Sequence, residues 1–138
     1  MTRTAITVQE PVLDTAATGK KSVAVLADPT ATTINSTLVS NGLSISNTFE
    51  EKDNTVYLIV YNSADAGKKL TIKAGDSYPN KVLGDYEITV AAGKTVILTI
   101  ENQSRFENKD GSVNIDFASG FTGTIYAIGK HAGIYLAS

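Results

Sequence analysis

The sequence predicts an all-β fold, either an antiparallel β-sandwich or a small barrel, and three observations predict it. From residue 41 onward, strand-like segments follow one another at intervals of about ten residues. Turn residues such as Gly, Asp, Asn and Pro separate these segments. No amphipathic helix of useful length interrupts them. This spacing favours a jelly-roll-like sandwich, with an immunoglobulin-like sandwich as the alternative topology.

The strands follow from the alternation of apolar and polar residues. In "SVNIDF", Val113, Ile115 and Phe117 lie on one face and the polar residues between them on the other. Such a segment covers a core with one side and meets solvent or a partner with the other. We expect strands at residues 43–49, 55–62, 68–74, 84–91, 94–101, 103–108, 112–117 and 122–129.

The length of 138 residues suits one domain, in which two regions differ in composition and strand pattern. Residues 1–40 are rich in Thr, Ala and Ser, and Pro11, Gly19 and Pro29 break their short β-prone runs. We therefore predict an extended N-terminal arm over residues 1–40. Residues 41–138 form the predicted sandwich body, which ends in a short C-terminal tail, "HAGIYLAS".

Composition argues against several classes of function. The net charge is −2, and Lys and Arg are spread along the chain, so no basic stripe is available for nucleic acid. The chain has no cysteine, which excludes disulfides and thiolate metal sites. No window approaches the length of apolar sequence that spans a membrane, and the opening "MTRTAITVQEPVLDT" lacks the apolar run of a secretory signal. We expect a soluble protein without nucleic-acid or membrane partners.

Familiar catalytic and cofactor motifs are incomplete. His131 is the only histidine and has no recognisable Ser or acid partner. "AAGKTV" ends like a phosphate-binding loop, but Ile88 occupies the place of the required first glycine, and a strand rather than a helix follows. "NKDGSVN" lacks the spacing of an EF-hand calcium loop. The sequence therefore predicts no enzyme, no cofactor and no metal.

The charged stretch "SRFENKDGSVNIDF" is predicted to be a β-hairpin. Asp-Gly between two alternating segments is a strong hairpin signal, so Asp110 and Gly111 are the expected turn. Counting back from that turn places Arg105 opposite Asp116, an ion pair on the outer face. The phenylalanine and isoleucine next to them then face the core. An exposed cross-strand pair of this kind contributes about 0.2–1 kcal/mol.

The segment "KAGDSYPNKVLGDYE", residues 73–87, is the longest loop expected within the body. Asp76, Tyr78 and Pro79 make it a candidate contact loop, because binding residues are frequent on long surface loops.

The order of motifs resembles a known family. The chain is similar to the head decoration (cement) proteins of tailed bacteriophages, which are encoded beside the major capsid protein. The resemblance covers most of residues 43–130 and the first forty residues loosely. It rests on "RTAITV", "TVYLIVYN", "TIKAGDSYP", "GDYEITVAAG" and "SRFENKDGSVNIDFASGFTGTIYAIGK".

The resemblance implies a structural role on the outer surface of the virion. Such proteins bind the outer face of the expanded head, commonly as homotrimers at three-fold positions, and bridge neighbouring subunits of the major capsid protein. The expected partners are therefore the major capsid protein and further copies of this chain. Extended arms add backbone hydrogen bonds to a neighbour, so we expect residues 1–40 to supply much of this contact.

Two alternatives come from other functional classes. A carbohydrate-binding module would need exposed coplanar aromatic residues, and several of the tyrosines fall on alternating strands where we expect them in the core. The available tyrosines are Tyr57, Tyr61, Tyr78, Tyr86, Tyr126 and Tyr135. A hydrolase would use carboxylates for acid–base chemistry. Its candidate carboxylates are Asp76, Asp85 and Asp116.

Overall fold

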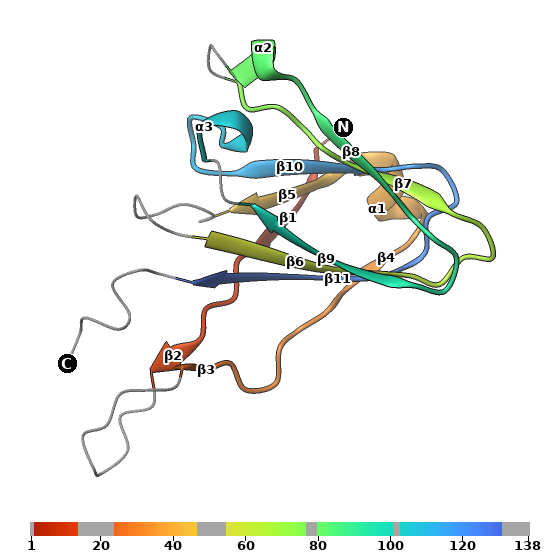
Figure 1. Cartoon of the computed structure of the whole chain (residues 1–138), viewed down its shortest axis with the longest axis horizontal. Coiled ribbons are helices and arrows are strands. Elements are labelled where there is room, and N and C mark those ends of the chain that lie inside the picture. Colours follow the sequence, from red (N-terminus) through yellow and green to blue (C-terminus); the bar gives the residue numbers. More distant parts are fainter. Residues whose placement is uncertain (1, 14–23, 47–54, 77–79, 101–102, 131–138) are drawn as a thin grey trace.

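Two β-sheets face each other across one apolar core (Figure 1). The computed structural model of the chain describes residues 2–13, 24–46, 55–76, 80–100 and 103–130. Sheet A contains, in spatial order, β1 (Thr4–Thr7), β5 (Leu43–Ser46), β10 (Val113–Phe117), β7 (Lys68–Ile72) and β8 (Tyr86–Val90). Sheet B contains β4 (Thr32–Ile34), β11 (Gly123–Lys130), β6 (Thr55–Asn62) and β9 (Thr95–Ile100).

This arrangement confirms the prediction of an all-β sandwich. Across the described ranges the two sheets stay separate and do not close into a barrel. Neighbouring strands are antiparallel in sheet B, whereas sheet A is mixed because β1 runs parallel to β5. The predicted strand over residues 55–62 is β6 with the same bounds.

Alternating side chains from both sheets fill the core. In β6, Val56, Leu58 and Val60 are fully buried, and Val113 and Ile115 meet them from β10. Burying one such aliphatic side chain stabilises the fold by about 1.5–3 kcal/mol. The largest fully buried side chains in the described ranges are Phe121, Ile34, Leu43, Ile45, Leu58, Leu70, Ile115, Ile125, Val56, Val60, Val90 and Val113.

The N-terminal forty residues contribute to the sandwich itself. β1 lies in sheet A and β4 in sheet B, and Val8, Ile34 and Leu38 are buried in the core. Leu38 comes from α1 (Ser36–Asn41), whose first turn is capped by the side chain of Asn35. The boundary predicted at residue 41 therefore does not coincide with a structural division. Among the described residues of this region, the ribbon of β2 (Val12–Leu13) and β3 (Ala24–Val25) extends away from the sheets (Figure 1).

The predicted hairpin around Asp110 and Gly111 is wrong. Residues 103–106 form a short helix, α3 (Gln103–Phe106), instead of a strand. β10 uses both of its edges for other partners, β5 and β7, so the expected register with residues 103–108 cannot form. A turn does lie at this place: Gly111 has φ of 85° and donates its N–H to the Asn108 carbonyl at 2.9 Å. It connects α3 to β10 rather than two paired strands.

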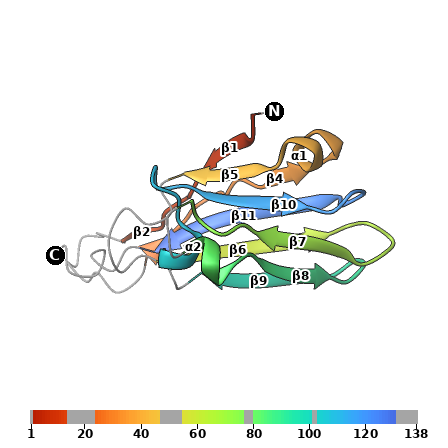
Figure 2. The same ribbon diagram turned by 90° about the horizontal axis from the view of Figure 1, so that it is seen from above.

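The loop over residues 73–87 contains a short helix, α2 (Asn80–Leu83), which contacts α3. Tyr78 and Pro79 of the predicted contact loop lie outside the described residues. Figure 2 shows that β8 and β9, the last strands of their respective sheets, lie along the same side of the sandwich.

Candidate functional site

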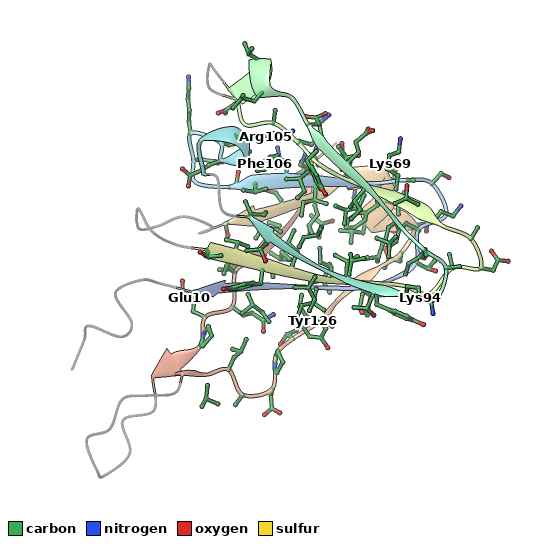
Figure 3. The ribbon with its side chains drawn as sticks, viewed as in Figure 1. Glu10, Lys69, Lys94, Arg105, Phe106 and Tyr126 are labelled. Atoms are coloured by element: carbon green, nitrogen blue, oxygen red, sulfur yellow. The ribbon has the colours of Figure 1, made fainter. Side chains whose placement is uncertain are left out.

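The outer surface of sheet B is the main candidate for binding, and we call it the tyrosine face. It consists of Tyr57, Ile59 and Tyr61 from β6, Ile97 from β9, and Tyr126 and Ile128 from β11. Figure 3 shows Tyr126 on the side of sheet B that points away from sheet A.

The alternation of β6 places these residues outward. Val56, Leu58 and Val60 point into the core, so the residues between them must point to the opposite face. The strand register then sets Ile59 between Ile97 on one side and Tyr126 on the other. In the same way, Tyr57 and Tyr61 have neighbours on both β9 and β11, so the face is continuous across three strands.

The described side chains of the tyrosine face carry no charge. Its other outward positions are threonines, and no Asp, Glu, Lys or Arg occurs within residues 55–61, 95–99 or 123–129, although β11 ends at Lys130, which pairs with Thr55 at the rim of the face. The side chain of Ile97 is 66% exposed and Tyr61 is 39% exposed, while Tyr57 and Tyr126 are partly buried by their neighbours. The described side chains of the face are thus uncharged and partly apolar, with tyrosine and threonine hydroxyls as the polar groups.

The outer surface of sheet A has the opposite character, and we call it the charged face. Three ion pairs cross it: Arg3–Asp116 at 2.6 Å, Lys69–Glu87 at 3.4 Å and Lys73–Asp85 at 2.8 Å. Figure 3 shows Lys69 on this outer side. Paired charges of this kind are well solvated and contribute little stability individually.

The Lys73–Asp85 pair is held firmly in its ionised form. The Ala74 N–H donates to the Asp85 carboxylate at 2.7 Å, and together with the Lys73 ammonium it holds the pKa of Asp85 below its ordinary value. The hydrogen bond to Asp85 in turn raises the pKa of Lys73. Both pKa values move away from neutrality, the opposite of what a general acid or base requires.

The turn before β10 is tied to Asp76 of the predicted contact loop. The exposed carboxylate of Asp76 accepts the Lys109 N–H at 2.9 Å, and the Asp76 N–H donates to the Asn108 side chain at 3.0 Å. Within the turn, the hydroxyl and then the N–H of Ser112 hold the pKa of Asp110 below its ordinary value. Asp76 and Asp110 therefore serve to shape the loop and the turn.

The predicted ion pair between Arg105 and Asp116 is also wrong. Arg105 lies on α3 and donates to the carbonyls of Gly84 and Asp85, each at 3.1 Å, and its guanidinium lies over the Phe106 ring. Asp116 accepts from Arg3 instead. Arg105 thus fastens α3 to the start of β8, and the N-terminal residues supply the counter-charge of Asp116.

The predicted core positions are wrong for three of the described tyrosines. Tyr57, Tyr61 and Tyr126 lie on the tyrosine face, whereas Tyr86 lies on the same side of β8 as the buried Val90 and is 40% exposed. The sequence contained one signal for this: in β6 both alternating sets are apolar or aromatic, which fits a central strand whose outer side also has a use. The other two tyrosines lie outside the described residues.

Metal-binding clusters and membrane-spanning helices are both absent from the part of the chain that the structure describes. No group of three or more His, Cys, Asp or Glu is placed there to hold a metal ion. No helix among those residues is long and apolar enough to cross a membrane.

His131 lies beyond the described ranges. Of the hydrolase carboxylates, Asp85 and Asp116 are ion-paired and Asp76 is bound to the turn.

No family model matches the chain, and no curated protein and no solved structure matches it either. The similarity to head decoration proteins therefore stays a prediction from the sequence motifs.

Proposed function

We propose that this protein is a non-catalytic binding protein that coats a protein shell through its tyrosine face. The sequence motifs favour the outer surface of a phage head, with the major capsid protein as the partner. The observation that carries the proposal is the uncharged outer surface of sheet B, beside a sheet A whose outer surface is covered with ion pairs.

The composition of the tyrosine face suits a protein partner. The centres of protein interfaces are depleted in charge and enriched in tyrosine, and their energy is concentrated in a few aromatic side chains. Tyr61 and Ile97 are exposed on this face with no charge that would have to be desolvated. The charged face loses more on dehydration, so in the proposed orientation sheet B meets the shell and sheet A faces solvent.

The proposal assigns no chemistry to the carboxylates. Asp85 and Lys73 have pKa values shifted away from neutrality, and their partners fix them as permanent charges. Glu107 differs, because burial raises its pKa, but burial alone does not place a reacting group beside it. A non-catalytic role is the simpler account of these groups.

Association with further copies belongs to the same proposal. The similarity to head decoration proteins implies homotrimers, and the β2–β3 ribbon, which extends from the sandwich in Figure 1, offers an element for contact between copies. Repetition on a lattice lets modest contacts act together.

The test starts from the gene beside the one for this chain, which the proposal expects to encode a major capsid protein, and measures binding to heads assembled from that protein. We expect saturable co-sedimentation with expanded heads, and electron cryomicroscopy should show added density on the outer surface with sheet B toward the shell. Heads that bind no protein at saturating concentration would refute the proposal. Density with sheet A against the shell would refute the assigned face while leaving the role intact.

Carbohydrate binding is a second candidate, because three tyrosines share one face of sheet B. Tyr57 and Tyr61 are about 13 Å apart at the usual rise of a strand, and Tyr126 lies between them on the next strand. Such a row can stack on sugar rings. A glycan array decides the matter: binding that disappears in Tyr126→Ala would favour this candidate, and an array without any binding would dismiss it.

A further inference from the structure

The edge strand β9 has backbone groups that point away from its neighbour β6. Where the two strands pair, the Asn62 N–H donates to the Lys94 carbonyl at 3.0 Å. Because the backbone groups of successive residues point to opposite sides of an antiparallel strand, every second residue from Lys94 to Ile100 faces β6 in this way. The residues between them direct their N–H and carbonyl groups to the open edge, where no strand pairs with them among the described residues. These residues are Thr95, Ile97 and Thr99.

This edge lacks the features that usually protect an edge strand. The sequence of β9, "TVILTI", has no charge and no proline. Ile97 is 66% exposed, and Val96 and Leu98 are only half-buried although they lie on the same side of β9 as the buried Ile100. Figure 2 shows β9 along the margin of the sandwich, together with β8. Such an edge pairs with another extended segment unless something covers it.

The other edge strands of the two sheets are less suited to pairing. β8, the edge of sheet A on the same side, carries Glu87, which is ion-paired with Lys69. β1 and β4, at the opposite edges, have four and three residues. Charged and very short edges resist pairing. Among these described strands, β9 is therefore the edge best suited to an added strand.

We propose that β9 pairs antiparallel with β9 of a second copy of this chain, about a two-fold axis at Ile97. A two-fold interface must be self-complementary, and the residues that face the edge read Thr-Ile-Thr in both directions. In this register Ile97 lies opposite the partner's Ile97, and Thr95 lies opposite the partner's Thr99. Three opposed pairs that each exchange two backbone hydrogen bonds give about six hydrogen bonds.

The side chains fit the same register. On the outer face Ile97 packs against its symmetry mate, and the opposed threonines form the kind of cross-strand pair that stabilises a sheet. On the core-facing side Val96 lies opposite the partner's Leu98, so the two half-buried side chains cover each other. β9 has no charge, so no like charges oppose each other. The two sheets B then form one continuous sheet, and this inference is independent of what the tyrosine face binds.

Single-cysteine variants test the proposal in the full chain, which has no native cysteine. In Ile97→Cys the two thiols face each other across the axis, at a Cα separation of about 5.5 Å that a disulfide can bridge. Tyr61→Cys is the matched control, because Tyr61 is also exposed on the tyrosine face but lies on the central strand β6.

We expect Ile97→Cys to form disulfide-linked dimers about ten-fold faster than Tyr61→Cys at equal protein concentration, because pairing raises the effective concentration of the thiols. A non-reducing gel measures both rates, and the difference should vanish in denaturant. Equal rates for the two folded variants would overturn the proposal.

A mixing experiment tests the register. Ile97→Lys and Ile97→Glu should both fold, because Ile97 is exposed, but each places like charges directly opposite each other and should lose the dimer. An equimolar mixture should restore it, because opposite charges then face each other. Sedimentation measures the dimer fraction, which should rise with concentration for the original chain. An undiminished dimer in either variant alone, or no recovery in the mixture, would overturn the two-fold pairing at Ile97.

Discussion

The outer faces of the two sheets follow the same alternation rule but present opposite surfaces. The outer face of sheet A carries three ion pairs: Arg3–Asp116, Lys69–Glu87 and Lys73–Asp85. Sheet B shows tyrosine, isoleucine and threonine with no charge between residues 123 and 129. The inward residues are alike in both sheets, so the core does not explain the difference. The two sheets therefore differ only in their outward residues, and we propose the uncharged face of sheet B as the binding surface.

The largest loss of stability is expected from Gly123→Ala, because this substitution disturbs the strand packing that supports the tyrosine face. Gly123 has φ of 136°, and a Cβ there would overlap the carbonyl oxygen of Tyr61. Because β11 must then shift on β6, we expect a loss of about 3 kcal/mol or more in unfolding free energy. Gly93→Ala is the matched control, since Gly93 has φ of 68° and open space around it. It should cost about 1–2 kcal/mol. Equal losses in denaturant unfolding would refute the overlap.

The next effect concerns Asn62, the buried polar side chain where the two sheets meet. It ends β6 of sheet B, and its amide donates to the Val90 carbonyl of sheet A at 2.9 Å and to the Ala66 carbonyl at 3.0 Å. Asn62→Ala leaves these carbonyls unsatisfied and should cost about 2–3 kcal/mol. Ser63→Ala, at an exposed neighbour, should cost less than about 1 kcal/mol. Similar losses in the two variants would show that Asn62 does not join the sheets.

A smaller effect is expected from the ion pairs of the charged face. Arg3 and Asp116 are 27% and 42% exposed, and Arg3 also donates to backbone carbonyls, so a double-mutant cycle should give a coupling of about 1 kcal/mol. Lys69 and Glu87 are more than half exposed, and their coupling should be near zero. High salt should reduce the first coupling. A stronger coupling in the Lys69–Glu87 pair would contradict this ranking.

The smallest effect is the dependence of stability on pH, to which Asp85 on the charged face and Asp110 in the turn before β10 should both contribute. The pKa of Asp85 is lowered in the folded state, so its contribution is present above the ordinary aspartate pKa of 3.8 and is lost as the pH falls through the folded value. Asp85→Asn should flatten the acid side of the stability curve, measured by unfolding at stepwise lower pH. An unchanged curve in Asp85→Asn would assign the acid dependence elsewhere.

Local patterns predicted the strands well and the long-range partners poorly. β6 and the inward set of β10 follow directly from alternation, which depends only on neighbouring residues. The hairpin at Asp110 failed because tertiary pairing of β10 with β5 and β7 outweighed the local turn signal. β1 was assigned to an arm because nothing in its four residues indicates a partner forty residues away.

The candidate site was missed for a related reason. Tyr57 and Tyr61 lie in a strand that is largely apolar on both sides, and a sequence of this kind predicts burial on both sides. Only the position of β6 between β11 and β9, with no third layer placed over them in the described residues, shows that one side is a surface. Arg3 was missed as the partner of Asp116 because 113 residues separate them.

The most direct test of the central claim is to place one charge on each face and compare binding to heads. Tyr61→Lys charges the tyrosine face, and Thr89→Lys charges an exposed position on β8 of the charged face. Both variants should unfold like the original protein, because both positions are exposed. We predict that Tyr61→Lys weakens binding by about ten-fold or more and that Thr89→Lys leaves it within about two-fold. Weaker binding in Thr89→Lys than in Tyr61→Lys, or equal binding in both, would contradict the assignment of the tyrosine face.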